Sequence, residues 1–194
     1  MFLDPKTVAD LAIRFQPKAY LRVLRAAHRA TPLGMGFGTS RFSSPSGAFQ
    51  LVYIARNLAT AIAETIVRDR FEGARDRTLD ESEIGEWAVA EVTATDPLVV
   101  LDLRSNGLLR LGVSTDATRA KAHREGQELS GEVYRSFNID GLLYCSRLTA
   151  TDCVAVYDRA VGIKLIASPA MELVRQADLV PALDAIGVTV RARR

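Results

Sequence analysis

Glu64 is the first residue whose position could serve chemistry. A predicted helix carries one apolar stripe, formed by Leu58, Ile62 and Ile66. Glu64 lies on the opposite side of that helix, where the small residues Thr60 and Ala61 leave space that a ligand could occupy. The alternative is a solvated carboxylate that pairs with Arg68 four residues later, a contact worth only a few tenths of a kcal/mol.

Arg41 and Tyr53 offer contacts of a different kind. Arg41 lies in the segment Ser40-Arg41-Phe42 of a Gly-rich loop, where a guanidinium can bind a pyrophosphate through two parallel hydrogen bonds. A solvated loop arginine is the alternative. Tyr53, late in a predicted strand, is by default a core aromatic, but its ring could also stack on a positively charged nicotinamide, with about 0.5–2 kcal/mol of cation–π attraction.

Three further side chains are candidates for the same pocket. Arg22 and Arg25 share one predicted strand, and a spacing of three places them on opposite faces, so only one of them should face a pocket. Ser146 begins the turn Ser146-Arg-Leu-Thr, and its hydroxyl either caps that turn or points at a ligand.

The composition excludes several other classes of site. Cys145 and Cys153 are separated by seven residues, which matches no zinc pattern, so both are expected to be reduced, packed thiols. His28 and His123 are isolated, so neither a metal site nor a Ser-His-Asp triad is expected. A net charge of +2 gives no field that argues for nucleic-acid binding.

The elements that must position these side chains follow from periodicity, caps and turn residues. Asp4 ahead of a proline and Asn57 ahead of an apolar run are predicted helix N-caps. The stretch 31–48 is predicted to be an irregular loop of functional length. Helices are expected over 5–15, 58–71, 115–137 and 169–187, the last broken or kinked near Pro181, and strands over 19–27, 49–55, 86–94, 98–103, 139–146, 152–158 and 188–192.

These elements predict the fold class. Strands do not alternate regularly with crossover helices, so we expect an α+β fold with a mixed sheet and flanking helices, in a single domain over residues 1–194. The spacing Gly34-x-Gly36-x-Gly38 misses the dinucleotide fingerprint of the Rossmann fold. The start, MFLDPKTVADLAIRF, lacks the pattern of a secretory signal, and no apolar run approaches the length of a membrane span, so a cytoplasmic location is expected.

Taken together, these segments resemble the RES domain, a family named for an Arg, a Glu and a Ser. The resemblance follows the order Arg22-Val23, PLGMGFGTSRFSSPSG, LVYIA, AIAETIVRDRF and DGLLYCS, and it is strongest over residues 40–71. Carried over, the name-giving trio is Arg41, Glu64 and Ser146, with Tyr53 as the pocket aromatic. Arg22 is then the second cationic contact, with Arg25 as its substitute. The family often has Pro directly before the Ser, whereas this chain has Cys145.

The resemblance also implies a function. Members of the family look like ADP-ribosyltransferases in fold and act as toxins of toxin–antitoxin pairs that consume NAD, here as a substrate and without a metal. A helical antitoxin of the Xre type, which covers the pocket and carries the DNA-binding surface, is the implied partner. The acceptor of the ADP-ribose, whether water, phosphate or a protein, stays open. Two rival classes stay open beside this one: an RNA-cleaving toxin and a binding module without activity.

Overall fold

The structure, a computed structural model, describes residues 1–36, 38–119 and 122–192. Its elements are α1 (Pro5–Leu11), β1 (Ala12–Phe15), β2 (Tyr20–Arg25), η1 (Ala26–His28), β3 (Leu51–Ala55), α2 (Leu58–Ile62), η2 (Ala63–Val67), β4 (Thr78–Asp80), α3 (Glu81–Ile84), β5 (Trp87–Ala94), β6 (Leu98–Asp102), α4 (Gly107–Arg110), α5 (Asp116–Arg119), α6 (Arg124–Ser136), β7 (Gly141–Cys145), β8 (Asp152–Tyr157), α7 (Asp158–Lys164), β9 (Leu165–Ala167), β10 (Met171–Glu172), η3 (Leu173–Arg175), α8 (Leu179–Asp184) and β11 (Thr189–Arg191).

A mixed sheet forms the centre of the molecule. Within the described residues nine strands join it, in the order β1-β6-β7-β8-β3-β2-β5-β10, with β9 paired beside β10 on β5. Among the described strands of this sheet only β6 and β7 pair in parallel, and α4 to α6 lie between them in the chain. β4 and β11 form a separate two-stranded parallel sheet. The predicted α+β class with a mixed sheet and flanking helices is therefore confirmed. No helix among the described residues is long and apolar enough to cross a membrane.

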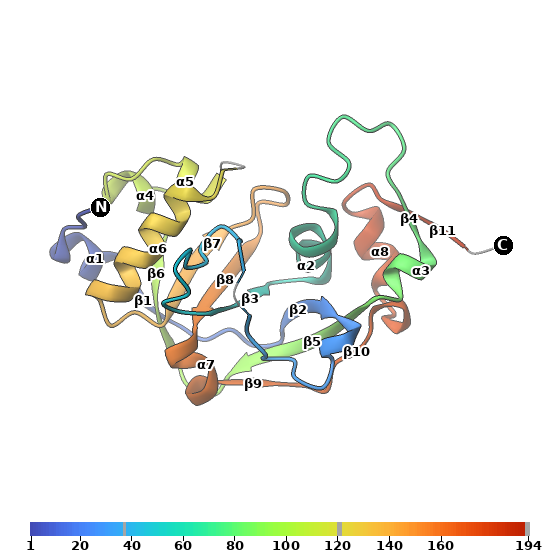
Figure 1. Ribbon diagram of the computed structural model, residues 1–194, viewed down its shortest axis with the longest axis horizontal. Helices are drawn as coiled ribbons and strands as arrows, with labels where there is room; N and C mark the ends of the chain where they lie inside the picture. The colour runs from blue at the N-terminus through green and yellow to red at the C-terminus, as the bar shows by residue number, and fades with distance from the viewer. Residues whose placement is uncertain (37, 120–121, 193–194) are drawn as a thin grey trace.

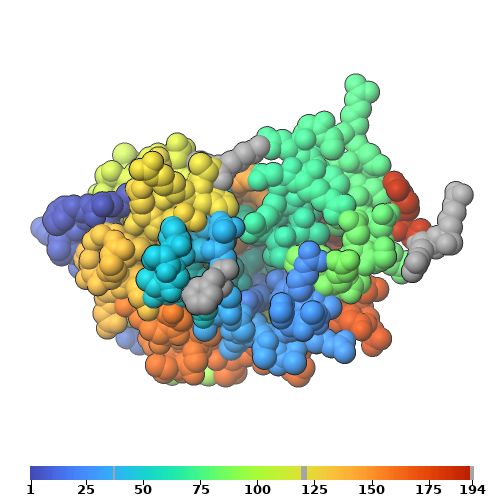
Figure 2. Space-filling view, viewed as in Figure 1, coloured from blue at the N-terminus to red at the C-terminus, as the bar shows by residue number. Residues whose placement is uncertain are grey.

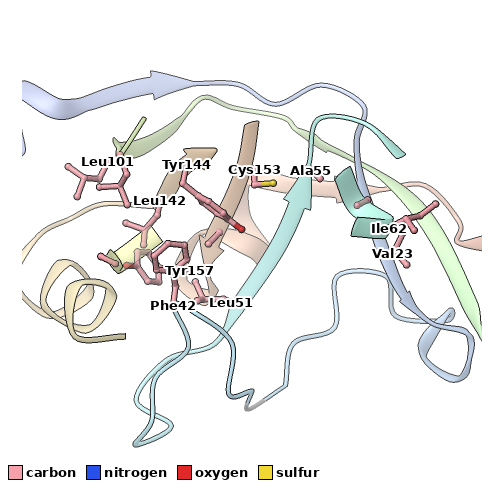
Figure 3. Packing of buried hydrophobic residues seen from close by; sticks show 14 of the residues in the cluster. Val23, Phe42, Leu51, Ala55, Ile62, Leu101, Leu142, Tyr144, Cys153 and Tyr157 are labelled. Carbon is pink, nitrogen blue, oxygen red and sulfur yellow. The ribbon is translucent and has the colours of Figure 1, made fainter. Parts of the chain in front are cut away.

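Helices gather over the two ends of the sheet (Figure 1). α1, α4, α5 and α6 lie near β1 and β6, while α2, α3 and α8 lie near β2 and β5. Strands in the middle alternate between two cores, as period-2 geometry requires: in β3, Leu51 and Ala55 face one core, whereas Val52 and Ile54 face the other. The sheet is thus buried on both faces, and the core that contains Leu51 and Ala55 is the larger of the two. Figure 3 shows part of the packing in this core.

The sheet opens between β2 and β3. Among the described residues these two antiparallel strands pair only at Leu21 and Ala55, although β2 is paired along its whole length with β5 on its other side. The loop 31–48 lies in the connection between β2 and β3 and has no helix or strand in its described part, as predicted. The splayed strands and this loop form the walls of a cavity.

Four sequence predictions of helices need correction. Residues 12–15 form β1 and pair with β6 instead of extending α1, although Asp4 does cap α1 through the Thr7 N–H. The helix predicted to reach residue 71 ends at Val67. The stretch 115–137 is divided into α5 and α6, with residues 120 and 121 outside the described part. Only α8 is α-helical within 169–187, because Met171 and Glu172 pair with β5.

Candidate active site

A cavity of about 440 Å³ lies on the face of the sheet that carries the larger core. This volume falls within the range of about 300–1,000 Å³ that is typical of small-molecule sites. Figure 2 shows the corresponding hollow between the loop before β3 and the segment after α2. Both charged and aromatic groups line it, among them Arg22, Arg41, Tyr53, Glu64, Thr65, Arg68, Asp69, His123, Tyr144, Arg147 and Cys153.

Glu64 reaches the cavity from the helix that follows β3. Asn57 caps this helix, since its side chain accepts the Thr60 N–H at 2.9 Å, as predicted. The Glu64 carboxylate is partly exposed and accepts a hydrogen bond from the Ser146 hydroxyl at 2.6 Å. Arg68 does not bind this carboxylate as the surface-pair alternative required. Its Nε donates instead to the main-chain carbonyl of Glu64 at 2.7 Å.

Ser146 orients Glu64 from beneath the cavity surface. It is 2% exposed and is not among the described residues that line the cavity. Its oxygen accepts the N–H groups of Leu148 and Thr149 at 3.1 and 3.2 Å, so the predicted turn-capping role is confirmed. With both amides donating to it, the hydroxyl proton is directed at Glu64. Ser146 therefore contacts the carboxylate and leaves the carboxylate to contact a ligand.

Arg41 shares the cavity with Glu64 although the two residues come from different elements. Both side chains line the same cavity. Burial lowers the pKa of Arg41, and the negative charge of Glu64 opposes that lowering. The guanidinium remains a cation at neutral pH because its ordinary pKa is far higher.

Helix α6 and its N-cap residue His123 fix the backbone just before Arg41. The His123 Nδ1–H donates to the Thr39 carbonyl at 2.6 Å, and Gln127 Nε2 donates to the Ser40 carbonyl at 3.2 Å. Gly126 allows the close approach, because a Cβ at that position would lie 2.6 Å from the Arg41 carbonyl oxygen. The segment that carries Arg41 is therefore held by hydrogen bonds at Thr39 and Ser40 and packed closely at Arg41.

Tyr53 and Tyr144 provide the aromatic wall. The Tyr53 hydroxyl accepts hydrogen bonds from Ser40 Oγ at 2.9 Å and from the Phe42 N–H at 3.2 Å, so it also ties the loop to β3. Burial raises the pKa of both phenols, which stay neutral. Figure 3 shows Tyr144 beside Cys153, its partner on β8, at the floor of the site.

The two arginines of β2 lie in different places. Arg22 lines the cavity, and its guanidinium donates to the carbonyls of Pro32 and Gly34 at 2.8 and 2.7 Å. Burial lowers the pKa of Arg22 to about 10. Arg25 is exposed, pairs with Glu86 and stacks on the Trp87 ring at 4.1 Å, outside the described cavity wall. Of this pair, the structure brings Arg22 alone to the site.

Several lining residues were not identified from the sequence. His123 was dismissed as isolated, yet the start of α6 brings it to the loop before β3. Arg147 forms an ion pair with Asp69 at the rim, a contact between segments far apart in the chain. Thr60 was expected to leave room for a ligand, but it is buried and hydrogen-bonded to Thr149, and only Ala61 lines this cavity. Across the described residues no group of three or more His, Cys, Asp and Glu could hold a metal ion.

Comparison with known proteins assigns the family. The RES domain profile matches residues 19–176, which is most of the chain and includes every candidate site residue. This chain belongs to the RES domain family. The chain is also 35% identical, over 97 residues, to the "Probable toxin y4kH" of Sinorhizobium fredii (strain NBRC 101917 / NGR234), covering 49% of this chain and 76% of that protein.

A solved structure shares the fold. A chain in the crystal structure of the M. tuberculosis MbcT-MbcA toxin–antitoxin complex superposes on this RES domain with a TM-score of 0.65. The match covers 88% of this chain and 93% of that chain at 18% sequence identity. At this sequence identity the match shows a shared fold and says nothing about the chemistry of the site.

Proposed function

We propose that this RES domain is a toxin that breaks the nicotinamide–ribose bond of NAD. The observation that carries the proposal is the convergence of a carboxylate, Glu64, and a guanidinium, Arg41, on one cavity of ligand size. A dinucleotide needs both kinds of contact, since it offers a sugar that becomes cationic and a pyrophosphate that is anionic. Tyr53 in the same wall offers a ring to the nicotinamide.

The site accelerates bond cleavage by stabilising the charge that develops on the substrate. The bonding electron pair leaves with the nicotinamide nitrogen, which makes the departing ring neutral and leaves positive charge on the ribose carbon. Glu64 faces that charge as a fixed anion and stabilises it more than the ground state, which is the condition for acceleration. The acceptor, water, phosphate or a nucleophilic protein side chain, then supplies an electron pair to the ribose carbon and gives up its proton.

Positioning falls to the cations and the aromatic wall. Arg41 binds the pyrophosphate and so sets the ribose against Glu64, a use of remote binding energy for orientation. Tyr53 stacks on the cationic nicotinamide, and this attraction disappears when the ring becomes neutral, which favours product release. Arg22 contributes positive charge to the wall, but its donors hold two loop carbonyls, so we assign it the task of fixing the Gly-rich loop over the substrate.

The relatives support the biological setting. One is called a probable toxin, and the structural neighbour comes from a toxin–antitoxin complex. We therefore propose that a cognate antitoxin of the Xre type binds this chain in the cytoplasm and covers its cavity. ADP-ribosylation of a protein target and plain NAD breakdown are alternative outcomes of the same cleavage step.

The decisive experiment follows NAD with the purified chain. The wild-type protein should consume NAD and release nicotinamide, whereas Glu64→Gln should lower the turnover at least about 100-fold, the scale of losing a charge-stabilising group. Glu128→Gln, an exposed glutamate of α6 that pairs with Arg124, is the matched control and should retain full turnover. Unchanged NAD together with degradation of added RNA would instead support an RNA-cleaving toxin. Unchanged NAD and RNA with no measurable NAD affinity would support a binding module.

A further inference from the structure

The helical turn that carries Glu64 is wider than an α-helical turn. In an α-helix the N–H of residue 68 would bond the carbonyl of residue 64. Here the Arg68 N–H bonds the Ala63 carbonyl at 2.7 Å, five residues back, and residues Ala63–Val67 form the π turn η2. Such turns insert one extra residue into a helix and occur often at functional sites.

The Arg68 side chain donates the hydrogen bond to the Glu64 carbonyl that the Arg68 main chain does not. Its Nε donates to the Glu64 carbonyl at 2.7 Å, so the guanidinium replaces the main-chain donor that the π turn redirects. Its backbone has φ 39° and ψ −118°, a conformation that non-glycine residues rarely adopt. The strained conformation and the side-chain contact occur at the same residue, which suggests that the second offsets the first.

The π turn is also tied to the turn that contains Ser146. Three contacts join the two segments: the Thr60 and Thr149 hydroxyls at 2.9 Å, Ser146 with Glu64, and the Arg147–Asp69 ion pair. Thr60 lies on α2 and Glu64 on the π turn, whereas Asp69 lies two residues beyond Val67, where the helical segment ends. The π turn is therefore flanked on both sides by contacts to the turn that contains Ser146.

We propose that Arg68 is a positioning residue that holds the π turn and thereby aims the Glu64 carboxylate at the substrate sugar. This inference rests on the proposed NAD cleavage for its catalytic consequence, but its structural part stands independently. Arg68 also lines the cavity, so a direct contact with substrate phosphate is the competing role, and the two roles make different demands on its side chain. Positioning needs a donor at Nε, whereas anion binding needs the positive charge.

Two substitutions separate these demands. In Arg68→Gln, the side-chain nitrogen is attached to Cδ, as Nε is in arginine, so a donor is kept while the charge is lost. In Arg68→Met both donor and charge are lost at similar length. Arg70→Met, which removes an exposed arginine two residues later that pairs with Glu83, is the control for loss of charge in this segment and should behave like the wild type.

The expected result is a split between kcat and KM. Arg68→Met should lower kcat for NAD about 10–100-fold with KM changed by less than about 3-fold, because a misplaced catalytic group costs rate and not affinity. Arg68→Gln should restore kcat to within about 3-fold of the wild type. A rise in KM of similar size in both variants, with kcat unchanged, would overturn the inference in favour of phosphate binding.

A structural measurement keeps the inference testable if the proposed function fails. Should the wild-type chain leave NAD intact, crystal structures of the two variants decide the matter. In the Met variant we expect the main-chain N–H of residue 68 to bond the carbonyl of residue 64, as in an α-helical turn. In the Gln variant we expect this N–H to keep its bond to the carbonyl of residue 63, as in the π turn. A Met variant with the π turn and the Ser146 contact both retained would refute the positioning role, whatever the activity.

Discussion

Ser146→Ala and Glu64→Gln should rank in opposite order for stability and for activity. The Ser146 hydroxyl donates to Glu64 and accepts from the N–H groups of Leu148 and Thr149, so its removal breaks three hydrogen bonds. Glu64→Gln removes only the charge from one of them, because the amide oxygen can still accept the Ser146 hydroxyl proton.

The magnitudes follow from these contacts. A hydrogen bond to a charged group is worth about 1.5–3 kcal/mol, and we take about half because Glu64 is partly exposed. The two turn amides add about 0.5 kcal/mol each, since water can replace their acceptor. Ser146→Ala should thus cost about 2 kcal/mol, or roughly 4–8 °C in Tm for a chain of this size, and Glu64→Gln about 0.5 kcal/mol, because it keeps a neutral hydrogen bond.

Activity should follow the reverse order. Glu64→Gln removes the anion that stabilises the ribose cation and should lower kcat at least about 100-fold. Ser146→Ala leaves the anion in place with a less defined orientation, and a loss of about 10-fold is expected. Thermal unfolding followed by circular dichroism and steady-state NAD consumption, measured on the same preparations, provide the two rankings.

One outcome would refute this reasoning directly. If Ser146→Ala unfolds at the wild-type temperature yet loses as much turnover as Glu64→Gln, then Ser146 acts on the substrate itself, and the buried position assigned to it is wrong. The reverse finding, a Glu64→Gln variant less stable than Ser146→Ala, would show that the carboxylate has a larger structural role than its partly exposed contact indicates.

Three further predictions concern the walls of the site. Burial raises the pKa of all five tyrosines above 10, so the folded chain should show little tyrosinate absorbance at pH 10. The stability that these neutral phenols contribute is complete below pH 10 and is lost as pH rises through their folded pKa values. Full ionisation of the tyrosines at pH 10 in a chain that is still folded would contradict this prediction. Arg22→Met should release the loop 31–48, seen as faster proteolysis within it, whereas equal cleavage rates would remove the tethering role. Phe42→Ala deletes a fully buried ring packed edge-on against Tyr144 at 5.0 Å and should cost about 3–5 kcal/mol in denaturant unfolding; a cost below about 1 kcal/mol would be inconsistent with that packing.

Local signals explain which parts of the fold could be predicted. The Asn57 cap, strand β3 and the irregular loop 31–48 depend on residues close to one another in the chain, and all three were predicted correctly. Strands β1 and β10 were mistaken for helix, because each is short and exists by pairing with a strand distant in sequence. Tertiary pairing overrides local propensity in such segments.

The candidate site shows the same division. Glu64 and Arg41 could be proposed from their own neighbourhoods, since a carboxylate opposite an apolar stripe and an arginine in a Gly-rich loop are local patterns. The π turn has no such pattern, and the contact between Ser146 and Glu64 beside it joins segments far apart in the chain. His123 and Arg147 likewise reach the cavity only through contacts with Thr39 and Asp69, which no spacing in the sequence encodes.

The attachment of helix α6 to the loop before β3 has a consequence for binding strength. Ordering a flexible loop around a ligand usually subtracts from affinity, because each immobilised residue loses conformational entropy. In this chain the carbonyls of Thr39 and Ser40 are already hydrogen-bonded to His123 and Gln127, and Gly126 lies close against the Arg41 carbonyl, before any substrate arrives. This entropy is therefore lost on folding and not on binding. A side chain at position 126 would push the loop away from α6, so that the loop would have to be ordered when the ligand binds.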